Sequence, residues 1–311
     1  MKKSEFSFIG DIATMFGTLP HHGFEPIGDD CTVLNMGDDA LVLTTDMLVE
    51  DVHFLRGASS AAEIAHKSLM VNLSDVAAMG AKPIATLLSL SLPESAQGEW
   101  SEEFMRGYYE ASERAEVALV GGDTTASRDR ITINVVAIGR VAKQNIKRRS
   151  AARLGDIIAV TGKLGASSKG LVDIMFGDLD TIAAKHHRVA QARIAEGVWL
   201  GGREEVHAMM DISDGIASDI KHIMELSKVG AEVELSKIPT DYDIRYATTG
   251  GEDYELLLTV EADSFDRVAE ELKEAKGTEL TAIGRITDSD ELCWLDNGAP
   301  ATIELKGFTH F

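Results

Sequence analysis

Acidic residues beside glycine or hydroxyl residues recur in six short segments of the sequence. The segments are Gly28-Asp29-Asp30, Thr44-Thr45-Asp46, Asn72-Leu73-Ser74-Asp75, Gly121-Gly122-Asp123-Thr124-Thr125, Asp211-Ile212-Ser213-Asp214-Gly215 and Gly250-Gly251-Glu252-Asp253. Carboxylates gathered in one cleft repel one another unless cations neutralise them. Oxygen ligands without nearby Cys or His are those that Mg²⁺ prefers, and Mg²⁺ in turn indicates a nucleotide phosphate. The pattern therefore predicts a site for Mg²⁺ and a nucleotide.

A single segment of this kind carries little weight, because an aspartate beside glycine is common as a helix N-cap or a turn residue. Six segments with similar neighbours favour a shared role over six unrelated caps. Asn72 and Asp75 support this interpretation, since residues three apart on a helix lie on one face. We expect strand ends at a sheet edge to bring the segments into one cleft, where glycines let a ligand approach the backbone.

Familiar nucleotide and nucleophile motifs are missing. The segment 165–170, Gly-Ala-Ser-Ser-Lys-Gly, has two glycines at the separation of a Walker loop, but Leu171 and Val172 replace the Lys-Ser/Thr pair. It is predicted to be a helix N-terminus, with contact between its amides and a phosphate as the less favoured alternative. No G-x-G-x-x-G follows a strand and no G-x-S-x-G elbow occurs, so dehydrogenase and hydrolase functions lose their main support.

Two basic residues outside the acidic segments have competing interpretations, and a histidine pair has one. His53, in Glu50-Asp51-Val52-His53-Phe54, is either a hydrogen-bonded histidine at a strand end or, through its nearness to Asp46, part of the site. Arg149 is either a solvated linker charge or a partner for triphosphate oxygens. The pair His186-His187 is expected at the surface.

Composition narrows the class of protein. A chain of 311 residues with 44% hydrophobic residues is long enough for two domains, and a net charge of -21 argues against nucleic acid or an anionic membrane as partner. Cys31 and Cys293 have no ligand spacing around them and are expected to be reduced thiols. No apolar run reaches signal-peptide or membrane-helix length, so a cytoplasmic location is expected.

Apolar periodicity and turn residues predict an α+β fold. Strands are expected at 31–35 and 40–45 around a hairpin turn, and at 83–92, 131–141, 156–161, 231–235, 255–260 and 280–286, with a last hairpin at 296–298. Helices are expected at 60–78, 101–116, 165–176, 188–199, 215–228 and 264–276. Ser60 and Glu63 form a predicted capping box for the first of these helices. A basic stretch from 142 to 156 is predicted to separate two domains.

With these segments in view, the chain resembles the thiamine-monophosphate kinases, a family of the aminoimidazole ribonucleotide synthetase-like superfamily. The resemblance spans nearly the whole chain. It rests on the motifs at 27–31 (IGDDC), 44–54 (TTDMLVEDVHF), 72–83 (NLSDVAAMGAKP), 121–125 (GGDTT), 148–156 (RRSAARLGD), 210–215 (MDISDG), 250–256 (GGEDYEL) and 306–311 (KGFTHF).

The resemblance implies an enzyme that uses ATP and several Mg²⁺ ions to convert thiamine monophosphate to thiamine diphosphate, the last step in the biosynthesis of that cofactor. It implies metal ligands at Asp30, Thr44, Thr45, Asp46, Asp75, Asp123, Asp211 and Asp214. It implies ATP contacts at Gly122, Asp123, Arg149 and Ser213, with Tyr109 as a further candidate, and substrate contacts at His53, Glu252 and Phe308. Ala151-Ala152 and Phe308 depart from the family pattern, which usually has a glycine and a Trp or Tyr there.

The family fold implies a two-domain homodimer. We expect residues 1–146 to form an N-terminal domain for Mg²⁺ and ATP binding and for dimerisation. Residues 147–311 are expected to form a C-terminal α+β domain that completes the substrate and nucleotide site.

The expected chemistry is direct in-line phosphoryl transfer without a phosphoenzyme. The acceptor phosphate is already ionised, so no side-chain base is expected, and Asp75 and Asp123 would act through the metal ions. Selenophosphate synthetase would show an N-terminal Cys or selenocysteine, and the carbamoyl-handling hydrogenase maturation protein a Cys near its C-terminus, whereas this chain ends Gly-Phe-Thr-His-Phe. A catalytically idle Mg²⁺-nucleotide binding module is the alternative from another class.

Overall fold

The computed structural model describes residues 4–301, 303, 305, 307 and 308. Five strands form a first sheet in the order β1-β2-β5-β3-β4, in which only the β3–β4 pair is parallel. Their bounds are β1 Thr32–Met36, β2 Asp39–Val49, β3 Lys82–Leu92, β4 Ala118–Ala126 and β5 Thr132–Ala142. The helices of this half are α1 Glu5–Phe16, α2 Ala61–Ala78 and α3 Glu99–Ala115. The predicted hairpin around 36–39 is confirmed as β1 and β2.

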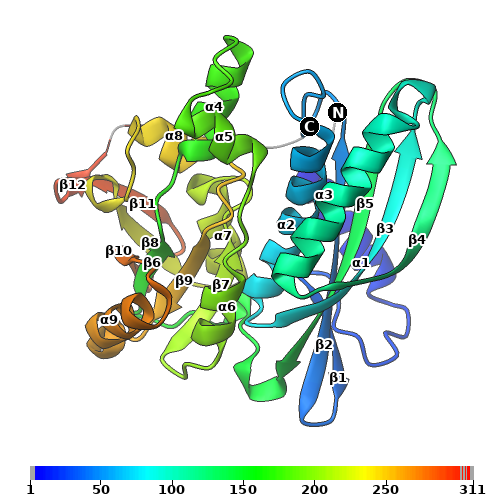
Figure 1. Cartoon of the computed structure of the whole chain (residues 1–311). Coiled ribbons are helices and arrows are strands. Elements are labelled where there is room, and N and C mark those ends of the chain that lie inside the picture. The colour runs from blue at the N-terminus through cyan, green and yellow to red at the C-terminus, as the bar shows by residue number, and fades with distance from the viewer. Residues whose placement is uncertain (1–3, 302, 304, 306, 309–311) are drawn as a thin grey trace.

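Helix α2 begins at the predicted capping box and is buried along most of its length. The Ser60 hydroxyl accepts a hydrogen bond from the Glu63 amide at 3.1 Å, and the Glu63 carboxylate accepts one from the Ser60 amide at 2.8 Å. The helix packs on β2, β3 and β5 of the first sheet and also on α6 and β7 of the second half. It therefore lies between the two halves of the molecule, as Figure 1 shows.

The second sheet has seven strands in the order β12-β11-β8-β10-β6-β9-β7. Their bounds are β6 Ile157–Thr161, β7 Val206–Asp211, β8 Gly230–Glu234, β9 Leu256–Val260, β10 Leu280–Thr287, β11 Leu292–Asp296 and β12 Ala299–Pro300. The helices are α4 Ala166–Met175, α5 Ile182–Arg188, α6 Ile194–Gly201, α7 Ile216–Ser227, α8 Ile244–Thr249 and α9 Phe265–Lys276. Short 3₁₀ turns lie at Glu94–Ala96, Lys143–Asn145, Arg149–Ala151, Leu235–Lys237 and Ala262–Ser264.

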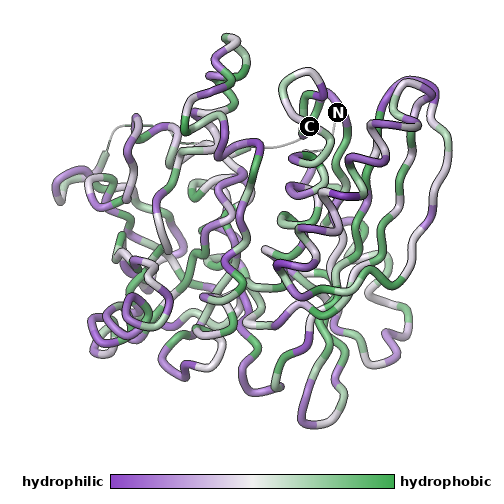
Figure 2. The backbone as a smooth tube through the Cα atoms, in the orientation of Figure 1, coloured by the Kyte–Doolittle hydropathy of each residue, from purple (hydrophilic) through white to green (hydrophobic). Residues whose placement is uncertain are grey.

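Alternate residues of the second sheet bury against different helices. On β6, Ile158 and Val160 belong to one apolar cluster with residues of α7, whereas Ala159 belongs to another with residues of α6 and α9. This is the two-residue period of a strand covered on both faces. Figure 2 accordingly shows hydrophobic residues along the strands and a largely hydrophilic α9 at the edge of the molecule.

The mixed architecture confirms the predicted α+β fold, with some local differences. The helix expected at 188–199 is wrong: α5 ends at Arg188 and α6 begins at Ile194. The Ala190 carbonyl in the gap accepts a hydrogen bond from His66 Nε2 of α2 at 2.8 Å. This bond takes the place of the backbone hydrogen bond that the carbonyl would accept within a continuous helix. The domain division at 146/147 falls between β5 and β6 and stays a prediction. No helix in the described part of the chain is long and apolar enough to cross a membrane.

Candidate active site at the junction of the two halves

Three carboxylates from separate parts of the chain meet where the halves join. Asp30 precedes β1, Asp75 lies on α2 and Asp211 ends β7, and each offers an oxygen within 4.8 Å of the other two. The predicted convergence of the acidic segments is therefore realised for these three residues. Their side chains come from both halves, so the cluster forms only in the assembled fold.

Hydroxyl groups beside the carboxylates hold them in place. Thr44 Oγ1 donates to Asp75 Oδ2 at 2.6 Å, and Ser74 Oγ donates to Asp211 Oδ2 at 2.6 Å. Asn72, on the same face of α2 as Asp75, accepts a hydrogen bond from the Asp46 amide at 2.8 Å. Each of these contacts joins two different acidic segments, so the hydroxyl and amide residues of one segment fix the position of another.

Asp30 has one satisfied oxygen and one that lacks a partner. The Arg149 guanidinium contacts Oδ1, while Oδ2 is buried without a hydrogen bond among the described residues. A buried acceptor without a donor is costly, and a hard cation bound by carboxylate oxygens would satisfy it. The donor set therefore fits Mg²⁺, with Asp30, Asp75 and Asp211 as the residues that would hold it.

Burial and mutual repulsion raise the pKa values of the clustered acids. Burial, then Asp46 and Asp211, hold the pKa of Asp75 well above its usual range. Burial and the charge of Asp30 raise the pKa of Asp211 to about 8, and that of Asp29 to about 7. A bound cation would thus stabilise the ionised form of each carboxylate, because it offsets the charges of the neighbouring acids.

These raised pKa values predict that the protein without Mg²⁺ loses stability as the pH rises. Unfolded aspartates titrate near about pH 4, whereas folded Asp29 and Asp211 keep protons up to about pH 7 and about pH 8. At these two groups the folded state then binds more protons from pH 6.5 to 8, and together they lower stability by about 2 kcal/mol over that range. From pH 6.5 to 8 the thermal midpoint of the Mg²⁺-free protein should fall by roughly 4 °C relative to that of the protein with saturating Mg²⁺.

His187 and His222, whose pKa values are about 4 in the folded protein, oppose this fall, because the unfolded chain still binds protons on them near pH 6.5. The Mg²⁺-bound protein contains the same histidines, so the comparison with saturating Mg²⁺ isolates the carboxylates. Asp211→Asn should remove much of the pH-dependent decrease in the Mg²⁺-free protein. A midpoint that is constant or rises from pH 6.5 to 8, with no difference between protein with and without Mg²⁺, would contradict the assignment of the cluster.

A cavity of about 540 Å³ opens beside the carboxylates. The predicted site residues that line it are Asp46, His53, Asp75, Ser213, Asp214, Glu252 and Phe308. A second cavity of about 260 Å³ shares His53 and Glu252 with it and is lined mainly by apolar side chains. The larger cavity therefore adjoins both the predicted metal ligands and the predicted substrate contacts.

The position of His53 is compatible with both interpretations of its role, and its part in binding stays a prediction. Its Nδ1 accepts a hydrogen bond from the Val49 amide at 3.0 Å, as expected at a strand end, and its ring lines both cavities. The surface location expected for His187 is wrong, because this residue is 7% exposed. Its Nδ1 lies 2.9 Å from Ser167 Oγ and 3.4 Å from Glu252 Oε2.

Arg149 and Ser213 lie on the cluster side of the site. Arg149 is 19% exposed and faces Asp29 and Asp30, which favours the second interpretation of this residue over a solvated linker charge. The Ser213 carbonyl accepts a hydrogen bond from the Glu252 amide at 2.8 Å. The adjacent Asp214 carbonyl accepts one from the Phe308 amide at 3.0 Å, which ties the described end of the chain to the site.

Several predicted residues are not brought to the carboxylate cluster. Thr45 faces the opposite side of β2 from Thr44, and its hydroxyl donates to the Val135 carbonyl at 3.0 Å. Asp123 of β4 pairs with Ser89 of β3, and Ser89 pairs with Asn134 of β5. Strand β5 in turn pairs with β2, so β3 and β5 separate Asp123 from β2. Three strand spacings place Asp123 roughly 14 Å from β2. The metal roles of Thr45 and Asp123 stay predictions.

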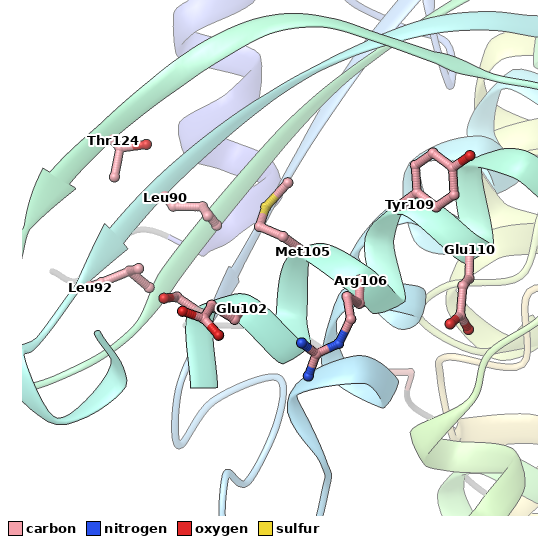
Figure 3. Close-up of a pocket in the computed structure, with 9 residues that line it drawn as sticks. Leu90, Leu92, Glu102, Met105, Arg106, Tyr109, Glu110 and Thr124 are labelled. Carbon is pink, nitrogen blue, oxygen red and sulfur yellow. The ribbon is translucent and has the colours of Figure 1, made fainter. Parts of the chain in front are cut away.

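Strand β4 also carries Gly122, and all nine of its residues are exposed. A Cβ at Gly122 would lie 1.8 Å from the Leu88 carbonyl oxygen, so the pairing with β3 requires glycine here. Beside β4, α3 presents Tyr109 to a hollow of about 840 Å³ that Thr124 also lines (Figure 3). Gly122, Asp123 and Tyr109 thus lie on a different side of the N-terminal half from the carboxylate cluster.

The start of α4 is occupied by a carboxylate. Asp253 accepts hydrogen bonds from the amides of Gly165 at 2.7 Å and Ser167 at 3.2 Å. These amides are therefore unavailable to a phosphate, which favours the helix N-terminus as the interpretation of segment 165–170. Sequence reasoning also missed Asp219, a buried acid of α7 whose Oδ2 accepts a hydrogen bond from the Asp214 amide at 3.3 Å.

Comparison with known families identifies the class of protein. Residues 28–141 match the family described as AIR synthase related protein, N-terminal domain, and residues 153–293 match AIR synthase related protein, C-terminal domain. Two matches in this order cover most of the chain and agree with a fold of two α+β halves. The chain is an AIR synthase related protein in both of its halves.

Individual relatives narrow the class further. Thiamine-monophosphate kinase of Escherichia coli (strain K12) is 36% identical over 308 residues, covering 92% of this chain and 91% of that protein. The enzyme of the same name from Buchnera aphidicola subsp. Acyrthosiphon pisum is 33% identical over 329 residues and covers 100% of both chains. A solved structure of AaThiL complexed with AMPPCP and TMP has a TM-score of 0.86 at 31% identity, and covers 100% of this chain and 99% of that chain. The chain belongs to the thiamine-monophosphate kinase family.

Proposed function

We propose that this protein is a kinase that transfers the γ-phosphoryl group of ATP to thiamine monophosphate, giving thiamine diphosphate and ADP. The observation that carries the proposal is the cluster of Asp30, Asp75 and Asp211 beside a cavity lined by His53 and Glu252. The relatives named thiamine-monophosphate kinase, and the AaThiL complex with an ATP analogue and TMP, support the same substrates.

The chain's own residues would bind and align two anionic substrates. Asp30, Asp46, Asp75, Asp211 and Asp214 would hold the metal ions, and Thr44 would orient Asp75 through its hydrogen bond. When bound, Mg²⁺ would neutralise phosphate charge and align the donor and acceptor for in-line attack. Arg149 would pair with phosphate oxygens, and Ser213 would contact the nucleotide from the loop after β7.

The acceptor would lie across the two adjoining cavities. Its phosphate would face Asp46 and Asp75, while His53, Glu252 and Phe308 would contact its organic part. Because the acceptor phosphate is largely ionised at neutral pH, no side chain has to remove a proton from it. This arrangement accounts for a site rich in metal-binding acids that needs no general base.

The amounts of product test the function. With ATP, Mg²⁺ and thiamine monophosphate, one ADP should appear for each thiamine diphosphate formed, and ADP should not accumulate when the acceptor is left out. Hydrolysis of ATP at the same rate without the acceptor, or no turnover with it, would overturn the proposal. No turnover despite tight nucleotide binding would identify the idle binding module instead.

We further propose that the protein works as a homodimer in which β4 of one protomer completes the site of the other. β4 is an exposed edge strand that presents Leu119 and Val120 at 42% and 62% exposure, and unprotected edges usually have a partner. The family motif places Asp123 at a metal site, yet Asp123 is remote from Asp75 in its own chain. A two-fold partner that supplied Asp123 would reconcile these facts.

Mixing two inactive variants tests this arrangement. Asp75→Asn and Asp123→Asn should each be inactive alone, because every site in either homodimer lacks one ligand. Hybrid dimers made by co-expression contain one intact site, so a 1:1 mixture should recover about a quarter of wild-type activity. A mixture no more active than its components, or a monomer that is active in dilute solution, would contradict the shared site.

A further inference from the structure

Lys67 is a buried cation that joins two of the three residues predicted to contact the acceptor. It lies on α2 and is only 2% exposed. Its ammonium group donates to the His53 carbonyl at 3.1 Å and contacts Glu252 Oε1 at 2.9 Å. His53 follows β2 in the N-terminal half and Glu252 precedes β9 in the C-terminal half, so one side chain connects both halves at the cavity.

Burying a lysine costs free energy unless its charge is paired, so replacing a buried lysine usually changes stability or binding. Here the partner is also largely buried, with a side chain that is 26% exposed. Burial alone would raise the pKa of Glu252, but Lys67 and His187 lower it below its ordinary value. Glu252 therefore lies at the junction of the two cavities as a carboxylate held ionised by Lys67.

The backbone of Glu252 is constrained as tightly as its side chain. Its φ angle is 64°, in the left-handed region that a residue with a side chain seldom adopts. Its amide donates to the Ser213 carbonyl, and a Cβ at Gly251 would lie 2.2 Å from that same oxygen. The loop is thus fixed to the predicted nucleotide side by its backbone, and to the predicted acceptor side by Lys67.

We propose that Lys67 is a positioning residue that sets the place of the Glu252 carboxylate and the His53 turn for binding the organic part of the acceptor. The proposal rests on the proposed function, because it assigns the adjoining cavities to the acceptor. Lys67 has no contact with the carboxylate cluster among its described hydrogen bonds. Its loss should weaken acceptor binding and leave ATP binding nearly unchanged.

Kinetics of Lys67→Met test the proposal, since methionine keeps the length of the side chain and removes the charge. The KM for thiamine monophosphate should rise by about 10-fold or more, as expected for loss of a hydrogen bond to a charged group. The KM for ATP should change by less than about threefold. Lys82→Met is a matched control, because Lys82 forms an exposed ion pair with Glu116 away from the cavities, and its kinetics should equal those of the wild type.

A double-mutant cycle separates positioning from a general structural role. If Lys67 acts in part through Glu252, the Lys67→Met/Glu252→Gln protein should have an acceptor KM well below that given by multiplying the two single effects. Any increase over Glu252→Gln alone would report the contact of Lys67 with the His53 carbonyl. Independent contributions would multiply instead. The double variant also removes both charges, so it avoids leaving a buried carboxylate unpaired and can be compared with Glu252→Gln even if Lys67→Met fails to fold.

Three outcomes would overturn the inference: equal increases in the two KM values, multiplicative effects in the cycle, or an acceptor KM unchanged in Lys67→Met. Failure of the proposed function looks different, because the wild-type protein itself would then show no turnover with thiamine monophosphate. The wild type is measured first in the same assay, so the two failures are distinguishable.

Discussion

Replacing Asp75 by asparagine should lower the rate of phosphoryl transfer by about 10³-fold or more, while the protein stays folded. Asp75 is one of the three clustered carboxylates, with one oxygen held by Thr44 and an oxygen within 4.8 Å of those of Asp30 and Asp211. Asparagine keeps the shape and can still accept the hydrogen bond from Thr44. It removes the charge that a shared cation requires, so the effect should fall on turnover rather than on folding.

The stability of the variant gives a second measurement. Since burial and neighbouring acids raise the pKa of Asp75, its ionised form is unfavourable in the protein without Mg²⁺. Asp75→Asn should therefore unfold at the same or a higher temperature than the wild type at pH 8 without Mg²⁺, and should gain less from added Mg²⁺. Asp39→Asn is the control and should behave as the wild type. Asp39 lies on the same strand as Asp46, but it forms an exposed ion pair with Arg140. Near-normal turnover of folded Asp75→Asn at saturating Mg²⁺ would count against the metal site.

The second large effect concerns the acceptor. Free thiamine should be phosphorylated at least about 10⁴-fold less efficiently in kcat/KM than thiamine monophosphate, because a site built around a polar group rejects an analogue that lacks it. The acceptor phosphate would complete the ligands around the metal ions, and a bare alcohol would leave those positions empty. An alcohol would also need a base, and the site's acids are committed to cations.

The difference in kcat/KM between thiamine monophosphate and free thiamine should appear in initial rates measured with each acceptor under the same conditions. Thiamine diphosphate added to the assay controls for a contaminating phosphatase, which would return it to the monophosphate. Comparable rates with thiamine and its monophosphate would mean that the acceptor phosphate contributes nothing to alignment. The role assigned to the carboxylate cluster would then be wrong.

Local sequence patterns predicted the parts of the fold that local physics determines. The capping box at Ser60 and Glu63 located the start of α2, and alternating apolar residues located β5 and β10. Strand β4 was missed because Gly121 and Gly122 break the apolar pattern and every residue of the strand is exposed. Its position depends on pairing with β3, which no local signal encodes.

The same limit applies to the site, where residue types could be recognised from the sequence but their packing could not. The acidic segments were identified from their residue types, and Asp30, Asp75 and Asp211 do converge. Lys67 and His187 were missed because lysine and histidine in a helix normally face solvent, whereas tertiary packing buries both of these side chains. The separation of Asp123 from the cluster was also invisible, since strand order is a property of the whole sheet.

Transfer of a labelled phosphate tests the central claim most directly. The protein would be incubated with Mg²⁺ and ATP labelled in its γ-phosphate, together with thiamine monophosphate, thiamine, or no acceptor, and the products separated by chromatography. We expect label in thiamine diphosphate with the monophosphate alone, none in thiamine monophosphate when free thiamine is the acceptor, and none with the Asp75→Asn protein. Label released only as inorganic phosphate, or transferred equally to free thiamine, would contradict the account.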